Sequence, residues 1–358
     1  MSNAPTMTSF STPASSATAW IRRLALVAFV LCFCVVVLGA YVRLTAAGLG
    51  CPDWPGCYGH FTPVGAASNA AAQAAYPNTP LHVEKAWREM IHRYAASTLG
   101  LLIVVITALS INTRKQRLVS VPLTVGLLIT VVFQGMLGML TVTWQLKPLI
   151  VTLHLLFGLT TLSLLWWLYL SLRTATRGGV RFAGASTSHV SAYPDSGRPP
   201  HRVMLVALIA LGFQIALGGW TSSNYAAIAC PDFPKCQDRW LPETDYKDAF
   251  VLWRGLGVNY EGGVLQHPAR VAIHFTHRLG AVVATGALIY AVVATLRRKV
   301  RSGTRLAAFT VLGALGLQLL IGSSMVLKGF PLALATAHNA GAALLLLSSL
   351  ALYRALRH

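Results

Sequence analysis

Charged side chains are scarce in this chain, and acidic ones most of all. Only 11% of the 358 residues are charged and only ten are acidic, against 55% hydrophobic residues. The mean hydropathy of +0.59 agrees with this balance. So few charges exclude an ordinary soluble protein and indicate a membrane protein.

The first twenty residues contain no charged side chain and are rich in Ser, Thr and Ala. A secretory signal carries basic residues before a short apolar core, and a mitochondrial transit peptide is rich in Arg. Neither description fits. We therefore interpret residues 1–23 as a disordered cytoplasmic tail and expect a protein of the bacterial inner membrane.

Long apolar runs are abundant, by contrast. About twenty apolar residues are needed to cross the hydrocarbon core of a bilayer as a helix. Eight such runs are present, at 24–44, 91–111, 118–142, 149–172, 203–223, 271–296, 306–327 and 332–353. The sequence therefore predicts an all-α integral membrane protein with eight transmembrane helices.

The net charge of +19 is unevenly distributed along these spans. With the N-terminus in the cytoplasm, 17 of the 29 Lys and Arg residues lie on the cytoplasmic side, and nine of the ten acidic residues lie outside or near the outer membrane face. This bias follows the positive-inside rule and places both termini inside. The basic charge is thus a topology signal, so we expect the lipid bilayer, and no nucleic acid, as a partner.

The chain also contains an internal repeat. CPDWPGC at 51–57 recurs as CPDFPKC at 230–236, and several further residues recur at nearly the same offset: Gly39 with Gly218, IHR at 91–93 with THR at 276–278, and Gln134, Gly138 and His154 with Gln318, Gly322 and His338. Four spans in each half return the chain to the same side, which predicts a parallel pseudo-two-fold repeat. We expect two tandem four-helix bundles at 24–172 and 203–353, a cytoplasmic linker at 173–202 and a short cytoplasmic tail at 354–358.

Four of the six cysteines form the repeated pairs Cys51 with Cys57 and Cys230 with Cys236, on loops that the topology places outside. That compartment is oxidising, and two cysteines six residues apart around two prolines can close a small disulfide loop. A metal pair is the alternative, although metal knuckles usually have a tighter spacing. Disulfides are favoured, and a redox or substrate-handling role for the first pair stays open.

Of the eleven histidines, five lie in the early turns of even-numbered spans: His92, His154, His274, His277 and His338. A lone histidine at such a place is usually a satisfied core residue, but ionisable groups in a membrane are costly and suggest function. Each half supplies one histidine from its second span and one from its fourth, His92 with His154 and His277 with His338. Facing imidazoles in a helix bundle are typical axial ligands of haem iron, so we expect one haem in each half.

All four histidines lie near the outer ends of their spans. A transmembrane electron carrier would usually stack haems at two depths, with two histidines a dozen or more residues apart on one helix. No span carries such a pair. Two haems at one depth suit chemistry on one of them, although a di-haem b electron-transfer subunit remains the main alternative and a transporter the third.

The cysteine loop, the EMIHR segment at 89–93 and the four histidines resemble the haem A synthase family over about residues 24–353. The resemblance implies oxidation of a methyl group of haem O to the formyl group of haem A, with haem b as cofactor. It implies that His277 and His338 bind haem b, that His92 and His154 bracket the substrate haem near the periplasmic side, and that the loop cysteines match those of the family. A haem O synthase would be the supplier and an aa3-type oxidase the recipient; the sequence does not identify the electron acceptor.

Glu89 distinguishes the first half, because the repeat places it opposite His274. One turn before His92, its carboxylate would face the porphyrin edge and accept a proton or stabilise a developing cation. The alternatives are an ordinary i to i+4 pair with Arg93 or a favourable acid at a helix start. We expect His274 to pack near haem b without being a ligand.

Three arginines, Arg43, Arg93 and Arg278, are candidate partners of haem propionates, since Arg binds carboxylates in a bidentate manner. Snorkelling to the membrane interface explains their positions equally well. The repeated glycines indicate close helix packing that leaves room for a macrocycle. The outer loop at 224–267 is long and acidic in its middle, and its residues do not decide between a partner-binding and a covering role.

Overall fold

The computed structural model describes residues 13–116, 119–178 and 201–357. Residues 1–12 of the expected tail and 179–200 of the expected linker lie outside the described residues. The first helix begins at Pro13, so residues 13–23 are helical. The fourth long helix likewise runs to Gly178, into the region expected to be linker.

The described residues are predominantly α-helical, and eight of their helices are long and apolar enough to cross a membrane. Each corresponds to one predicted span, although α5 begins at Val121, three residues after the start predicted for its span. The eight helices are α1 (Pro13–Leu44), α4 (Val83–Asn112), α5 (Val121–Thr143), α6 (Pro148–Gly178), α7 (His201–Ser223), α9 (His267–Leu296), α10 (Ser302–Leu327) and α11 (Leu332–Arg357).

Helices α4 and α9 both begin before their apolar runs. Helix α4 starts at Val83, eight residues ahead of the predicted span, and carries Glu84 in its first turn, where a negative charge is favourable. Helix α9 starts at His267 with a proline in its first turn, where the missing N–H costs no hydrogen bond. His92 and His277 consequently lie several residues inside their helices rather than at the entrance.

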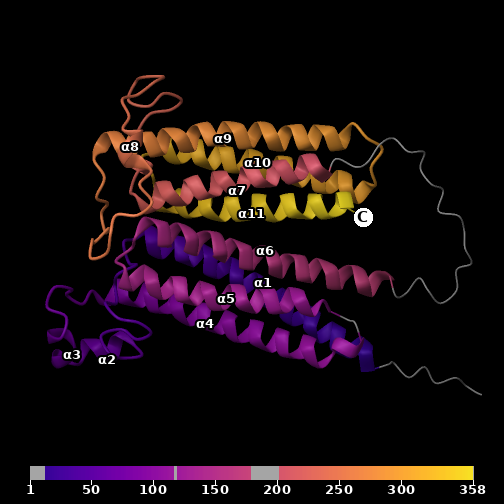
Figure 1. The fold of residues 1–358 in the computed structure, drawn as a ribbon, viewed down its shortest axis with the longest axis horizontal. Coiled ribbons are helices and arrows are strands. Elements are labelled where there is room, and N and C mark those ends of the chain that lie inside the picture. The colour runs from indigo at the N-terminus through magenta and orange to yellow at the C-terminus, as the bar shows by residue number, and fades with distance from the viewer. Residues whose placement is uncertain (1–12, 117–118, 179–200, 358) are drawn as a thin grey trace, which may run out of the picture.

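The eight helices lie in two groups, α7, α9, α10 and α11 above α1, α4, α5 and α6 in Figure 1, and the contacts within each group close it into a ring of four. In the first ring α1 packs on α4, α4 on α5, α5 on α6 and α6 on α1; in the second, α7, α9, α10 and α11 pack in the same order. Between the rings, α1 contacts α11, α6 contacts α7, and α6 contacts α11. Exchanging the two halves leaves this set of contacts unchanged, which is consistent with the predicted parallel repeat.

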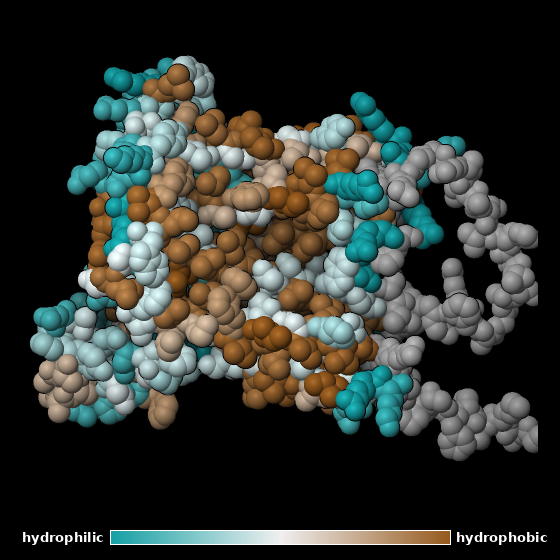
Figure 2. All heavy atoms as spheres, viewed as in Figure 1, coloured by the Kyte–Doolittle hydropathy of each residue, from teal (hydrophilic) through white to brown (hydrophobic). Residues whose placement is uncertain are grey.

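One continuous hydrophobic core runs through both rings, with buried residues such as Ile103, Leu162, Leu211 and Leu352 from all parts of the bundle. The face shown in Figure 2 carries a broad hydrophobic band across the middle of the helices, with hydrophilic residues gathered at both ends. A band of this kind matches the hydrocarbon layer of a bilayer. The chain is thus a multi-pass membrane protein.

One end of the bundle carries the two cysteine loops and three short helices, α2 (Pro63–Ala67), α3 (Ala70–Ala74) and α8 (Tyr246–Ala249). We call this the loop end. The described chain ends, residues 113–116 after α4 and the turn at 297–301 lie at the opposite end (Figure 1). The sequence did not predict the short helices, because none has an apolar period long enough to detect.

The turns at the loop end repeat between the halves. The turn between α5 and α6 closes with Leu146 N–H donating to Thr141 C=O over 2.8 Å, and the turn between α10 and α11 closes with Phe330 N–H donating to Met325 C=O over 2.8 Å. Both turns pass through the left-handed region, with φ of 59° at Leu146 and 61° at Phe330. Equal turns at equal places set α6 and α11 at the same height.

Candidate functional site

Each of the four predicted haem-binding histidines lies against a glycine of the preceding long helix. A Cβ atom built on any of these glycines would come within 3.3 Å of the imidazole Cε1 atom, closer than ordinary contact allows. The pairs are Gly39 with His92 (2.9 Å), Gly138 with His154 (3.3 Å), Gly218 with His277 (3.1 Å) and Gly322 with His338 (3.0 Å). Glycine is therefore the residue that leaves room for each ring.

The two histidines of a half come from helices at opposite corners of its ring. His92 on α4 and His154 on α6 are both flanked by α1 and α5, and His277 on α9 and His338 on α11 are both flanked by α7 and α10. The side chains of each pair lie close enough to interact electrostatically. The structure therefore brings His92 together with His154, and His277 together with His338, inside their bundles.

The imidazoles retain unused nitrogen atoms. Nδ1 of His92, His154 and His338 is buried and has no hydrogen-bond partner. Buried polar atoms in proteins normally have partners. His277 differs, because its Nδ1 lies 3.1 Å from the Gln214 amide. A pair of neighbouring buried imidazoles is a donor set that fits the axial positions of a haem iron, so the residues present suit such a group.

Three glutamines support the histidines from the neighbouring helix. The side-chain amide of each donates to the backbone carbonyl of a histidine, Gln134 to His154 (2.8 Å), Gln214 to His277 (3.0 Å) and Gln318 to His338 (3.1 Å). The amides of Gln214 and Gln318 also lie 3.1 and 3.3 Å from a ring nitrogen. Val35 occupies the matching place beside His92, so that ring has no such support.

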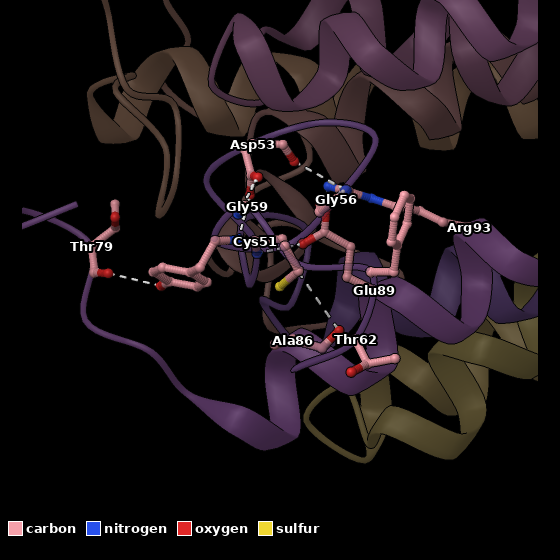
Figure 3. The surroundings of a disulfide bond; sticks show 12 residues. Cys51, Asp53, Gly56, Gly59, Thr62, Thr79, Ala86, Glu89 and Arg93 are labelled. Carbon is pink, nitrogen blue, oxygen red and sulfur yellow. Dashed lines mark hydrogen bonds and ion pairs between the residues drawn. A yellow bond between two sulfur atoms is a disulfide. The ribbon is translucent and has the colours of Figure 1, made fainter. Parts of the chain in front are cut away.

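Glu89 lies beneath the first cysteine loop and is only 4% exposed. Its Oε2 accepts a hydrogen bond from Cys51 N–H at 2.9 Å, and its Oε1 forms an ion pair with Arg93 (Figure 3). Arg93 in turn donates to the carbonyl oxygens of Asp53 (3.0 Å) and Gly56 (2.6 Å). The carboxylate and the guanidinium thus hold the loop to α4, which is the i to i+4 pairing considered from the sequence.

His274 holds the second cysteine loop in the same way. Its Nδ1 accepts a hydrogen bond from Cys230 N–H at 3.3 Å. Arg278 donates to the carbonyl oxygens of Cys230 (2.8 Å) and Lys235 (2.7 Å). Glu89 and His274 therefore occupy equivalent places and each accepts a hydrogen bond from the first cysteine of its loop. They differ in that one side chain is a carboxylate and the other an imidazole.

The predicted cysteine pairs are disulfide-bonded, Cys51 to Cys57 and Cys230 to Cys236. Each loop is closed further by an aspartate. Oδ1 of Asp53 accepts from Tyr58 N–H at 2.6 Å, and Oδ1 of Asp232 accepts from Gln237 N–H at 2.6 Å. Although burial alone would raise the pKa of Asp232, these backbone N–H groups and Arg278 hold it below its ordinary value.

The candidate propionate arginines have protein partners. Arg93 and Arg278 bind the cysteine loops as described, and Arg43 at the end of α1 donates to Ser222 C=O of the other half at 2.6 Å. Its guanidinium lies 4.0 Å from the centre of the Tyr225 ring. Nε of Arg43 is buried and has no hydrogen-bond partner among the described residues, so this donor is available to a ligand.

Lys147, which the sequence reasoning did not single out, is 1% exposed at the start of α6. Its ammonium donates to Gly255 C=O and lies 3.2 Å from the centre of the Trp253 ring. None of the described carboxylates pairs with it, and burial lowers its pKa. This side chain fastens the long loop of the second half onto the first half.

A cleft of about 510 Å³ opens at the loop end beside these contacts. The first half contributes Gly50, Pro52 and Lys85, next to the segment that Glu89 holds. The second half contributes Asn259 and Glu261. Residues of the loop at 224–267 therefore line a cleft together with the first half.

Fold and site together define a class: helical membrane proteins of eight spans, with a pair of neighbouring intramembrane histidines in each four-helix half. The chain matches the COX15-CtaA family, described as cytochrome oxidase assembly protein, over residues 22–350. Because this match covers most of the chain, the protein belongs to that family.

Curated relatives extend over nearly the whole chain. A haem A synthase of Shewanella oneidensis is 43% identical over 332 residues, which cover 92% of this chain and 93% of the relative. A haem A synthase of Rhizorhabdus wittichii is 28% identical, with 88% of each chain covered. A haem A synthase of a Chelativorans species is 25% identical, covering 94% of this chain and 91% of the relative.

Proposed function

We propose that this protein is a haem A synthase, an oxidoreductase that oxidises the methyl group of haem O to the formyl group of haem A. The observation that supports this most directly is the placement of two facing histidine pairs, each seated on glycines inside its own bundle. The family membership and the names of the relatives point to the same activity.

In this proposal His277 and His338 hold a haem b cofactor, which supplies electron-transfer chemistry when bound. Gln214 and Gln318 contact both the backbone and the ring of these histidines, so the second half is built to keep its ligands in fixed orientations. His92 and His154 bracket haem O in the first half. His92 lacks a glutamine, which suits a site whose occupant must leave after reaction.

Glu89 is the proposed catalytic residue. Its carboxylate lies one helical turn from His92 and is buried, so a proton or a positive charge near it interacts strongly. The second half carries His274 at the same place. The reaction is therefore assigned to the first half, and the free Nε of Arg43 is the best remaining candidate for a propionate contact.

We also propose the orientation and the setting. The loop end faces the periplasm of a bacterium, where disulfides are stable, and both termini lie in the cytoplasm. A haem O synthase delivers the substrate, and assembly of an aa3-type oxidase consumes the product. The bacterial relatives and the distribution of positive charge support this arrangement.

The test is co-expression with a source of haem O, followed by acid extraction and chromatography of the haems. A synthase produces haem A that is absent from cells without this chain. A protein that binds haem but leaves haem O unchanged would be a di-haem electron-transfer subunit instead, and a protein that purifies without a Soret band would be neither.

A further inference from the structure

The two cysteine loops share one rigid frame. Each contains a disulfide, an aspartate that accepts two backbone N–H groups, and a bridge between the second cysteine and the residue three positions later, Cys57 with His60 and Cys236 with Arg239. The arginine one turn beyond the helical anchor fixes each frame to its helix. Side chains on these frames are therefore held in place rather than sampling many positions.

Both frames present exposed aromatic rings at the same two places. Trp54 and Phe233 lie between the cysteines and are 45% and 49% exposed. Phe61 and Trp240 directly follow the bridge and are 82% and 67% exposed. Each pair is separated by 179 residues, the offset of the loops themselves. A rigid loop that exposes large aromatic rings to water in both halves indicates a surface that is covered in the membrane.

In the first half the loop lies beside the lipid-facing side of α4. The hydroxyl of Tyr94 donates to the backbone carbonyl of Phe61. Tyr94 belongs to an exposed stripe of α4 that includes Ile91 and Leu101. Phe61 is therefore attached next to residues that face lipid.

In the second half the Phe233 ring lies 5.8 Å from the Arg278 guanidinium of α9. The residues that follow on α9 include Leu279 and Val282, both exposed and apolar. The second cysteine loop, like the first, therefore lies next to a lipid-facing side of its helix. The two loops lie on opposite flanks of the loop end (Figure 1).

We propose that the two cysteine loops are seated in the interfacial layer of the bilayer, with Phe61 and Trp240 as the main anchors to lipid. Aromatic rings are favoured at the boundary between headgroups and acyl chains, where one side is apolar and the other wet. A bilayer surrounds the protein and reaches both flanks at once. One soluble protein partner would instead need to contact two distant and equivalent surfaces.

The inference is tested by replacing Phe61 or Trp240 with the photoreactive residue p-benzoyl-L-phenylalanine. The full-length variants are reconstituted in vesicles of phosphatidylethanolamine and phosphatidylglycerol, irradiated and analysed by mass spectrometry. Matched controls carry the same residue at Ser68 and Asp238, exposed polar positions near the same loops. We expect phospholipid adducts at 61 and 240 in about fivefold or greater excess over the controls, as interfacial burial implies.

Equal adduct yields at the anchor and control positions would overturn the proposal. So would irradiation of whole cells that captures protein at 61 and 240 in place of lipid, since the surfaces would then be docking sites for a protein. The readout does not involve haem, so its failure is distinguishable from failure of the proposed synthase activity.

Discussion

At the scale of single residues, Glu89 and His274 show how one structural task is met with two chemistries. Each accepts a hydrogen bond from the backbone N–H of the first cysteine in its loop. Burying a carboxylate is costly, and the second half shows that the anchor does not require one. The carboxylate in the first half therefore calls for a further reason, which the proposed reaction supplies.

Replacing Glu89 with histidine, the residue found at the equivalent position 274, separates the loop-anchoring role of Glu89 from its proposed catalytic role. In E89H the imidazole can accept the Cys51 N–H as His274 accepts Cys230 N–H, but no carboxylate remains. We expect haem binding and the disulfide loop to persist while conversion of haem O falls by about 100-fold or more, the usual contribution of a general acid or base. Haem A formation in vivo and the Soret spectrum of the purified protein measure the two effects.

The matched control is H274E, which places a carboxylate in the second half and should leave turnover largely intact. E89Q keeps the shape of the side chain and should behave as E89H does. If E89H and E89Q both retain normal turnover, Glu89 serves only to anchor the loop.

Gly322 gives a second test at this scale. An alanine Cβ there would lie 3.0 Å from Cε1 of His338 and would displace the ring, whereas Gly316 on the same helix has open space around it. We expect G322A to lose most of the bound haem b and G316A to retain it, as measured by the pyridine haemochrome content of each purified protein. Full haem content in G322A would argue against His338 as a ligand.

The histidine positions were predictable because ionisable residues are rare in apolar spans and these recur in both halves. The role of Gln214 could not be predicted from the repeat. Its counterpart in the first half is Val35, so the two halves share no glutamine at this place. Lys147 was also missed, since only the folded chain shows that the loop of the other half buries it.

At the scale of elements, the cysteine loops depend on their aspartates. The pKa of Asp232 is lowered in the folded protein, so its stabilisation of the loop is present above the ordinary pKa of Asp, about 4, and is lost as pH falls through the lower folded-state pKa. We expect D232N to speed hydrogen exchange of the Gln237 and Asp238 amides by up to about tenfold at neutral pH. The exchange rates of D232N and wild type should become equal once the pH falls below the folded-state pKa of Asp232, because the wild-type carboxylate is then protonated.

The same substitution in the first loop, D53N, should affect the Tyr58 and Gly59 amides alone. Exchange that rises in both loops after a single substitution would show that the loops are coupled, contrary to their separate hydrogen-bond networks.

Helix number and order were predicted correctly because a bilayer imposes a minimum apolar length. Helix ends were not. Helix α4 begins eight residues earlier, at Val83, in a segment that mixes charged and apolar side chains, because backbone hydrogen bonding propagates a helix beyond its apolar run. The disulfides were predicted from the cysteine spacing and the oxidising compartment. The anchoring of each loop by its helix was not predicted, because it joins residues far apart in the sequence that only the folded chain brings together.

At the scale of the whole molecule, the contact of Lys147 with Trp253 ties the long loop of one half to the other. W253A would leave the buried ammonium with the Gly255 carbonyl and the more distant Trp144 ring, whose centre is 5.8 Å away, a loss of about 1–2 kcal/mol. We expect trypsin to cleave faster after Arg254 in this variant, while L256A, which changes an exposed neighbour, should be cleaved at the wild-type rate. Unchanged cleavage of W253A would mean that other contacts hold the loop.

The contacts between the rings are of the self-complementary kind that two identical subunits make around a two-fold axis. A dimer encoded by one short gene would carry the same amino acid at both corresponding places. Covalent fusion removes that restriction, so mutation can alter a single member of a duplicated pair. An acid at 89 and an imidazole at 274 could not occupy equivalent places in such a homodimer, but they do so in this fused chain.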